Sequence, residues 1–457
     1  MNAPDRLTAA ADAIERTMAQ GLNAVLAYER ETVVRQVHRD ISGPLAGRAI
    51  GIKDNICTLE YPTTCASRIL AGYQSPYEAT AVERIKAAGG IIACKTNLDE
   101  FAMGSSTEHS AFGPTRHPHF PDRVPGGSSG GSAALVASGA VDVALGSETG
   151  GSVRQPAAFC GIVGFKPSYG RVSRFGLVAF GSSLDQIAVF GRRVQDVIDV
   201  VEVITGHDPN DSTSLAEPPL DVGRPPADLD GVVVGLPVEC FPDDLDADVR
   251  AACDRAADAM RAGGARLRPV SLPHTELAVA TYYVIAPAEA SANLARYDGV
   301  RYGQRRGADA GREAMYRATR GAGFGPEVQR RILIGTYVLS AGYYEAYYGR
   351  AQATRARIAA DYRHVFANGV DLLLTPTTPG PAFRMGEHVH DPVAMYRADQ
   401  FVCGANLAGL PAVSVPAGAT GAGLPLGVQL IGSVGADARV LSAAALLASH
   451  VAGGQLQ

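Results

Sequence analysis

The sequence predicts an α/β protein in which helices cover both faces of a β-sheet. Short apolar runs rich in β-branched residues alternate with segments of helical period along the whole chain. Glycine and proline pairs separate these segments, as at Gly43-Pro44 and Gly89-Gly90. The chain has 457 residues, 46% of them apolar and 19% charged, which is enough to bury an extensive core.

The predicted elements follow in a regular order. Apolar residues at helical spacing predict an amphipathic helix over residues 7–30. Strands are expected over residues 49–53, 91–95, 141–146, 162–166, 232–236, 372–375, 413–416 and 428–431. Further helices are expected over residues 79–88, 132–140, 194–205, 246–262 and 438–448, with two long ones within 325–368. A surface connection is expected over the proline- and acid-rich residues 216–230.

The composition excludes several classes of protein. The net charge of −5 and the pI of about 6.1 argue against a chain that binds nucleic acid by itself. The seven cysteines contain no CxxC pair and are odd in number, which predicts reduced thiols rather than a disulfide framework or a zinc site. The N-terminus lacks the apolar core of a signal peptide, and no apolar stretch reaches the ~18 residues that a membrane span needs. We expect a soluble, cytoplasmic protein.

Three segments stand out for their chemistry. Lys53 ends an apolar strand, Ser128 lies in the Gly/Ser-rich loop 125–132, and Ser152 follows a Gly-Gly pair after a predicted strand. Each segment alone is weak evidence, because a lysine at a strand end is usually solvated and a Gly/Ser loop is usually a connection or a phosphate cradle. Nucleotide binding is an alternative for this loop, although the GxxxxGK[ST] pattern of a P-loop is absent.

The combination indicates nucleophilic catalysis by a serine. A serine hydroxyl needs a neighbouring base, and no histidine here lies in a GxSxG-type motif. A lysine can take this role when burial lowers its pKa, and a second serine can pass the proton to it. A developing oxyanion would be met by the backbone N–H groups of Thr149, Gly150, Gly151 and Ser152.

These segments, in this order and at these separations (75 residues from Lys53 to Ser128, then 24 to Ser152), resemble the amidase signature family. The resemblance implies that Lys53 is the base, that Ser128 is the bridging serine after a cis peptide bond, and that Ser152 is the nucleophile. It also implies one domain built on a mixed, twisted sheet with helices on both faces. Its parts are expected to be an N-terminal helical segment (1–40), the amidase core (43–432) and a C-terminal helix (433–457).

Finer segments resemble one branch of this family, the A subunits of the glutamine-dependent aspartyl/glutamyl-tRNA amidotransferases. The segments that carry this resemblance are residues 97–108, 165–173, 297–303 and 342–344. In that branch an arginine and an aspartate hold the α-carboxylate and the α-amino group of glutamine, and the matching positions are Arg331 and Asp399. An arginine suits this task because it can bind a carboxylate bidentately. Tyr302 is expected to line the glutamine pocket.

The same resemblance implies a division of labour between subunits. This chain would hydrolyse glutamine, and the ammonia would travel to a B subunit that amidates ATP-activated Glu-tRNA(Gln) or Asp-tRNA(Asn). A small C subunit would complete the heterotrimer, with no contact to a membrane. No cofactor is expected in this chain, because ATP and Mg²⁺ would be used by the partner subunit, which would also make most of the tRNA contact.

Other interpretations stay open from the sequence. Arg331 would otherwise form a salt bridge on a helix surface, and Asp399 would otherwise cap a turn. Asp185 either anchors the active-site loops or makes a structural hydrogen bond, while Arg154 and Gln155 are expected to brace the turn at the nucleophile. For the whole chain the alternatives are a free-standing amidase acting on a small amide and a catalytically idle scaffold.

Overall fold

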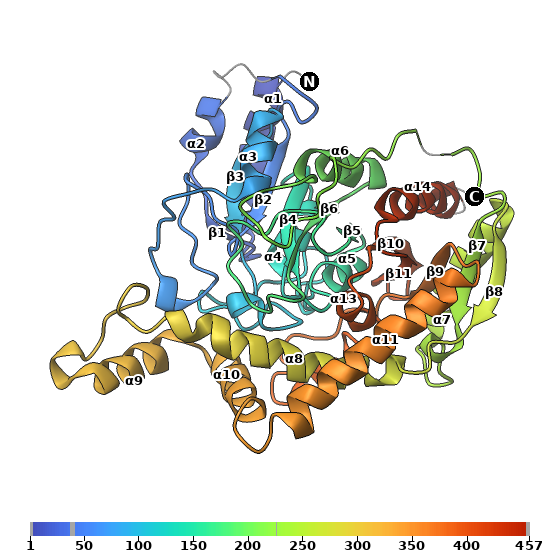
Figure 1. The fold of residues 1–457 in the computed structure, drawn as a ribbon. Helices are drawn as coiled ribbons and strands as arrows, with labels where there is room; N and C mark the ends of the chain where they lie inside the picture. Colours follow the sequence, from blue (N-terminus) through green and yellow to red (C-terminus); the bar gives the residue numbers. More distant parts are fainter. Residues whose placement is uncertain (1–2, 37–41, 225, 454–457) are drawn as a thin grey trace.

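A computed structural model describes residues 3–36, 42–224 and 226–453. The centre of the described protein is an 11-stranded sheet (Figure 1). From one edge to the other its strands are β1 (Val25–Ala27), β3 (Ile91–Thr96), β2 (Ala49–Lys53), β4 (Val143–Glu148), β6 (Gln186–Gly191), β5 (Val163–Lys166), β10 (Ala412–Ala419), β11 (Pro425–Gly432), β9 (Leu372–Pro376), β7 (Val233–Pro237) and β8 (Arg266–Val270). Strands β3, β2 and β4 are parallel to one another, as are β9, β7 and β8, whereas the pairs between these groups are antiparallel. The sheet is therefore mixed, as predicted.

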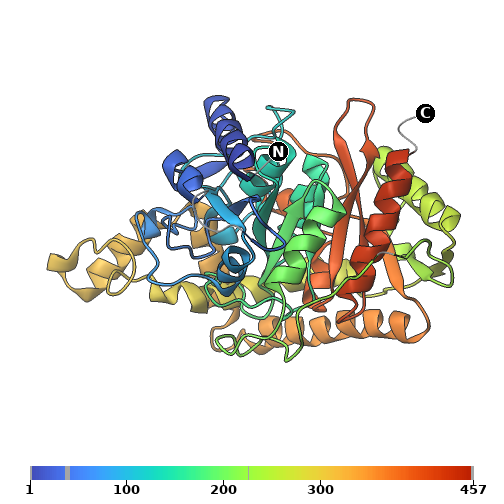
Figure 2. The same ribbon diagram turned by 90° about the horizontal axis from the view of Figure 1, so that it is seen from above.

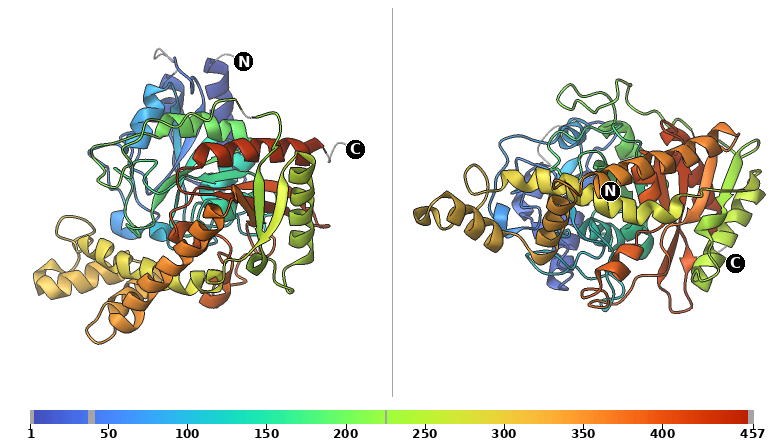
Figure 3. Two further views of the ribbon diagram at one scale, coloured as in Figure 1. Left: turned by 45° about the vertical axis from the view of Figure 1, so that its right-hand side comes forward. Right: turned by 60° about the horizontal axis from the view of Figure 1, so that its bottom comes forward.

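Helices cover both faces of the sheet (Figures 1 and 3). One face is packed by α3 (Thr80–Ala87), α6 (Val194–Ile204), α7 (Ala247–Ala262) and α14 (Asp437–Gly453). The other face is packed at the β2–β4 end by α1 (Ala3–Ala19), α4 (Gly130–Ala137) and α5 (Arg154–Cys160), and towards β9 by α8 (Ala278–Asn293), α11 (Arg350–Ala367) and α13 (Cys403–Leu407). The remaining helices are α2 (Arg30–Arg35), α9 (Arg312–Gly323), α10 (Pro326–Val338) and α12 (Pro392–Arg397). Figure 2 shows α9 projecting beyond the end of the sheet.

Alternation along the strands assigns side chains to the two faces. In β2 and β4, the larger residues Ile50, Ile52 and Leu145 point to the face covered by α3 and α6. The smaller residues Ala49 and Ala144 point to the opposite face, under α1 and α4. Successive side chains of a strand point to opposite sides, so this pattern follows from the sequence. The small residues let α4 lie close to the strands whose ends form the candidate site.

The predicted helix over residues 7–30 is wrong in its second half. Helix α1 ends at Ala19, the chain turns at Gly21 (φ +73°), and β1 pairs antiparallel with β3. Backbone hydrogen bonds to β3 outweigh the helical spacing of the apolar residues, a tertiary effect that periodicity does not contain. The N-terminal segment predicted as helical therefore contains a strand between α1 and α2, and residues 37–41 lie outside the described residues.

The structure bears on two expectations from composition, that the cysteines are reduced and that no segment spans a membrane. All seven cysteines are buried and free of disulfide bonds, as predicted. Among the helices of the described residues, none combines the length and the apolar character needed to cross a membrane. Residues 216–230 form neither helix nor strand in their described part, which agrees with a surface connection.

The packing of α10 on α8 yields a first prediction. A Cβ added at Gly335 of α10 would lie 1.9 Å from the backbone oxygen of Pro287 in α8. We expect Gly335→Ala to push the helices apart and to lower the free energy of unfolding by about 1–3 kcal/mol, measured by chemical denaturation. The control is Gly321→Ala in α9, where a Cβ meets no atom within 4 Å and stability should stay equal or rise. Equal stability of the Gly335→Ala variant and the wild type would contradict this account.

Candidate active site

The three segments that carry Lys53, Ser128 and Ser152 meet at the carboxyl ends of β2 and β4. Lys53 is the last residue of β2, and the turn that carries Ser152 follows β4. These two strands are parallel neighbours, so their carboxyl ends lie side by side. The loop that carries Ser128 ends where α4 begins, and α4 packs across both strands. Residues far apart in the sequence are thereby brought together.

Lys53 is fully buried and is held by three oxygen atoms. Its Nζ lies 2.8 Å from Ser128 Oγ, 2.8 Å from Ser129 Oγ and 3.2 Å from the backbone oxygen of Ser147. Burial lowers the pKa of Lys53 to about 7, although Asp99 and Asp185 act in the opposite direction. A neutral amine is therefore accessible near neutral pH, as a general base requires.

The hydrogen-bond partners of neutral Lys53 determine the direction in which its lone pair points. A neutral lysine has two N–H groups and one lone pair. The backbone oxygen of Ser147 only accepts, and Ser129 Oγ donates its single hydrogen to that same oxygen at 3.1 Å, so both take an N–H from Lys53. The lone pair of Lys53 is left for the hydroxyl of Ser128, which then donates. The site thus orients the base towards the predicted bridging serine, whose peptide bond with Gly127 is cis.

The turn that contains Ser152 leaves backbone donors free. Gly151 has a φ of +132°, a conformation that side chains rarely adopt, and Ser152 is 8% exposed. The carbonyl of Ser152 accepts a hydrogen bond from the backbone N–H of Ser129 at 3.2 Å, which sets the two serine loops side by side. Within the described part of the chain, the backbone N–H groups of Gly150, Gly151 and Ser152 donate to no protein atom. They are available to a developing oxyanion.

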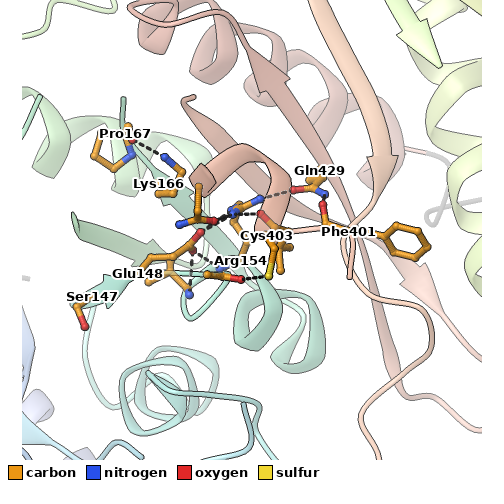
Figure 4. Close-up of polar contacts among 12 residues, drawn as sticks. Ser147, Glu148, Arg154, Lys166, Pro167, Phe401, Cys403 and Gln429 are labelled. Carbon is orange, nitrogen blue, oxygen red and sulfur yellow. Dashed lines mark hydrogen bonds and ion pairs between the residues drawn. The ribbon is translucent and has the colours of Figure 1, made fainter. Parts of the chain in front are cut away.

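A buried ion pair spans this turn (Figure 4). Glu148, the last residue of β4, accepts from Arg154 Nε at 2.8 Å and from the backbone N–H groups of Val153 and Arg154 at 3.0 Å. Arg154 also donates to Gln429 at 2.6 Å and to the backbone oxygen of Val402 at 2.8 Å. Burial opposes ionisation of Glu148, but the Arg154 guanidinium outweighs it and keeps the pKa of Glu148 below its ordinary value. Arg154 therefore braces the turn, as predicted.

A second brace involves Asp185. The hydroxyl of Thr149 donates to Asp185 at 2.7 Å, and the backbone N–H groups of Phe180 and Gly181 donate to the same carboxylate. Burial raises the pKa of Asp185 to about 6, although the hydrogen bond from Thr149 lowers it. Asp185 thus anchors the loop 180–185 to the start of the Ser152 turn.

Arg331 lies on α10 and is buried among aromatic rings. Its guanidinium lies 5.8, 5.1 and 5.5 Å from the ring centres of Phe180, Tyr283 and Tyr396. Its Nε donates to Glu327 at 2.8 Å. Within the described residues, its two terminal amino groups donate to no protein acceptor. An arginine arranged in this way can bind a carboxylate bidentately.

Asp399 lies between α12 and α13 and reaches the same region. Ser105 Oγ donates to its Oδ2 at 2.5 Å, whereas its buried Oδ1 has no hydrogen-bond partner. A Cβ placed on Gly151 would lie 3.4 Å from this free oxygen, so Asp399 borders the Ser152 turn. Burial raises the pKa of Asp399 to about 7, while Ser105 and Arg331 lower it. An ammonium group would supply the missing partner and favour the carboxylate.

The prediction for Tyr302 differs from what the structure shows. Its ring packs against Tyr73 and Tyr297, each at 6.0 Å, and lines a separate cavity of about 120 Å³. The tyrosines beside the predicted substrate-binding residues are instead Tyr283 and Tyr396, which stack at 3.6 Å next to Arg331. Sequence reasoning also missed the roles of residues that contact the selected side chains: Ser105, Ser129, Tyr282 and Glu327. Only the serine pair 128–129 offered a signal for one of them.

The described residues hold no group of three or more His, Cys, Asp or Glu side chains arranged to bind a metal ion. The site is instead composed of a buried lysine, hydroxyl groups, free backbone N–H groups and two ionic side chains of opposite charge. This arrangement can carry out acyl transfer from an amide with a charged amino-acid backbone. The expectation that this chain needs no cofactor remains a prediction.

Fold and site together point to one class, serine-dependent amide hydrolases, and the chain belongs to the amidase family. The profile of this family, described as Amidase, matches residues 7–441. This match confirms the family that the sequence resemblance indicated and identifies the chain as related to enzymes.

Individual relatives indicate a particular branch of this family. The chain is 57% identical over 406 residues to the A subunit of the glutamyl-tRNA(Gln) amidotransferase of Synechococcus sp. (strain RCC307), covering 88% of this chain and 83% of that protein. It is 54% identical over 429 residues to the protein of the same name from Carboxydothermus hydrogenoformans, covering 94% and 88%. The crystal structure of the corresponding Thermotoga maritima protein has a TM-score of 0.81 and 42% identity, covering 98% of this chain and 94% of that one. A bacterial aryl acylamidase has a TM-score of 0.84 and 25% identity, covering 100% and 94%. These matches confirm the predicted fold.

The lowered pKa of Lys53 has a consequence for stability. The folded-state pKa of about 7 lies below the ordinary value of 10.5, so between these values the unfolded chain binds more protons and stability rises with pH. We expect the free energy of unfolding of the wild type to rise by roughly 2 kcal/mol more than that of Lys53→Met between about pH 7.5 and 9.5. Denaturant titrations at both pH values measure this difference. Identical changes in the two proteins would show that Lys53 is not the titrating group.

Proposed function

We propose that this chain is the glutaminase subunit of a tRNA-dependent amidotransferase. The observation that carries the proposal is the pair of unsatisfied ionic groups beside the Ser152 turn. Arg331 offers two free amino groups and Asp399 a free, buried carboxylate oxygen. A free amino acid carries one carboxylate and one ammonium group, and glutamine adds a side-chain amide for the nucleophile. The relatives are named as A subunits of glutamyl-tRNA(Gln) amidotransferases, which supports a reaction that transfers an amide nitrogen.

The proposed reaction begins with attack of Ser152 Oγ on the carbon of the glutamine side-chain amide. The proton of Ser152 passes to Ser128 while the proton of Ser128 passes to the lone pair of Lys53. The backbone N–H groups of Gly150 to Ser152 stabilise the oxyanion, and each such donor contributes roughly 3 kcal/mol in acyl-transfer sites. The C–N bond then breaks, and the departing nitrogen takes a proton back from Lys53 through Ser128, so that ammonia leaves.

The second half of the reaction restores the enzyme. Water attacks the ester that joins Ser152 to the glutamyl group, and Ser128 and Lys53 again accept and return a proton. Glutamate leaves and the hydroxyl of Ser152 is regenerated. Lys53 acts here by accepting a proton, so it must be neutral when each attack begins, and its pKa of about 7 suits this role.

The ammonia would serve a partner, and this is supported by the relatives' names, which describe one subunit of a larger amidotransferase. In this proposal a B subunit uses ATP and Mg²⁺ to activate Glu-tRNA(Gln) or Asp-tRNA(Asn) and adds the ammonia, while a C subunit completes a cytoplasmic heterotrimer. The net charge of −5 agrees with tRNA contact made mainly by the partner.

Replacing Lys53 tests the proton-transfer role. We expect Lys53→Arg and Lys53→Ala to reduce glutamine hydrolysis about equally, by roughly 1,000-fold or more, because an arginine keeps the charge but cannot accept the proton. Ser152→Ala should lose activity to the same extent, whereas Lys86→Arg, at a lysine outside the site, should not. Ammonia release from glutamine is the measurement. An active Lys53→Arg variant would exclude the neutral-lysine mechanism.

Substrate preference and dependence on partners distinguish the proposal from a free-standing amidase. We expect hydrolysis of L-glutamine to exceed that of 4-aminobutanamide, which lacks the α-carboxylate, and to increase when partner proteins co-purified from the native host are added. Mass spectrometry of the co-purified proteins identifies them. Robust hydrolysis of simple amides by the isolated chain, with no partner effect, would favour the free-standing amidase.

A further inference from the structure

Glu327 lies in the first turn of α10, one turn before Arg331. Its carboxylate is buried, and both of its oxygens are used. Oε1 accepts from Arg331 Nε at 2.8 Å and from the Tyr396 hydroxyl at 3.1 Å, while Oε2 accepts from Arg330. Groups on α10 and α12 thus fix Glu327 in place, and Glu327 accepts a hydrogen bond from Arg331 through Nε alone among the described contacts.

The choice of nitrogen matters for recognition. A guanidinium group is planar, so holding Nε fixes the direction in which the two terminal amino groups point. Tyr283 and Tyr396 stack on each other next to the guanidinium group, and Phe180 lies near it as well. The rings limit tilting of the guanidinium, while Glu327 limits rotation of the side chain. Together they leave the two terminal amino groups free of protein acceptors within the described residues.

A neighbouring cavity shows why such a restraint is needed. A cavity of about 650 Å³ borders α10, and Glu327 forms part of its wall. Without the carboxylate of Glu327, the Arg331 side chain could turn toward this cavity, where its charge would be better solvated. The start of α10 is itself fixed, because Glu100 accepts a hydrogen bond from the backbone N–H of Gly325 at 2.7 Å. The helix therefore stays in place, and the direction of Arg331 depends on Glu327.

Glu327 remains ionised in this setting. Burial opposes ionisation, but the charge of Arg331 outweighs it, so the pKa of Glu327 lies below its ordinary value. The opposite charges of Glu327 and Arg331 offset part of the cost of removing each group from water. A substrate carboxylate then meets an arginine that is already oriented and desolvated, and less side-chain freedom is lost on binding.

We propose that Glu327 is a positioning residue for the substrate: it holds Arg331 by Nε so that the two terminal amino groups face the site and receive the α-carboxylate of glutamine. This inference rests on the proposed function and adds a residue to it that touches neither substrate nor reacting atoms. Its effect should appear in the KM for glutamine and not in the chemical step.

The test compares two substitutions with different geometry. Glu327→Ala removes the restraint, and we expect the KM for glutamine to rise at least 10-fold with kcat within about twofold of the wild type. Glu327→Gln keeps an oxygen acceptor for Arg331 and Tyr396, so it should recover most of this loss. Tyr396→Phe, which removes one hydrogen bond to Glu327 but keeps the ring, should raise KM by a few-fold. The matched control is Glu313→Ala in α9, which breaks an exposed pair with Arg317 at the same helical spacing and should change nothing.

Two further measurements separate the possible failures. Arg331→Met should raise the KM for glutamine at least as much as Glu327→Ala does. Both changes should have a much smaller effect on the slow hydrolysis of 4-aminobutanamide, which lacks the α-carboxylate. If Arg331→Met has its effect but Glu327→Ala does not, the positioning role is overturned while the proposed function stands. If Arg331→Met leaves the KM for glutamine unchanged, the proposed function itself fails. A loss of kcat with both substrates, together with a lower melting temperature, would show that Glu327 only stabilises the fold.

Discussion

The buried ion pair between Glu148 and Arg154 is the interaction on which the rest of the site depends. Two charges removed from water are tolerated only when they meet each other and satisfy their remaining hydrogen-bonding groups. Here the carboxylate also accepts two backbone N–H groups at the start of α5. The pair therefore links the end of β4 to the start of α5, and Ser152 lies in the turn between them. Arg154 extends the same network to Gln429 and to Val402, which lies close to Asp399 in the chain.

Three buried lysines, Lys53, Lys95 and Lys166, lie on strands of the sheet and differ in the groups that surround them. These surroundings distinguish a structural lysine from one that can act in catalysis. Lys95, on β3, forms an ion pair with Asp54 at 3.1 Å, which satisfies its charge. Lys53, on the neighbouring strand β2, meets only two hydroxyl groups and a carbonyl. Lys166 donates to the backbone oxygen of Pro167, and burial lowers its pKa to about 7 as well, but Arg154 also contributes to that shift. Of the three, Lys53 alone contacts the hydroxyl of Ser128, so a free lone pair there can act in catalysis.

The sequence predicted those features that depend on neighbouring residues and on motifs that occur in a set order. Lys53 and the Ser152 turn end adjacent strands. The sequence grouped them through the order and separation of the motifs, which resemble the amidase signature family, and not through strand pairing. The substrate-binding pocket was less predictable, because it is formed where helices cross. Tyr283 comes from α8 and Tyr396 from α12, and they stack only after both helices pack on α10. Among 17 tyrosines nothing local distinguishes these two, whereas Tyr302 lies in segment 297–303, which carries the family resemblance. Strand β1 likewise depends on a partner strand that lies much later in the chain.

The groups proposed for the chemical step and the groups proposed for substrate binding lie in different parts of the fold. This separation explains how one fold can act on different amides. The proposed base and the turn with free N–H groups lie at the ends of β2 and β4, and the proposed bridging serine lies in the loop before α4. These groups require nothing of the substrate beyond an acyl group. In the proposed function, selection of the substrate falls to α8, α10 and the segment around Asp399, which cover the neighbouring part of the sheet. A similar fold therefore leaves the substrate undetermined, whereas in the proposed function Arg331 would bind an anion and Asp399 a cation of the substrate. In this proposal, those two charges and the residues that orient them distinguish a hydrolase that selects an amino acid from a general amide hydrolase.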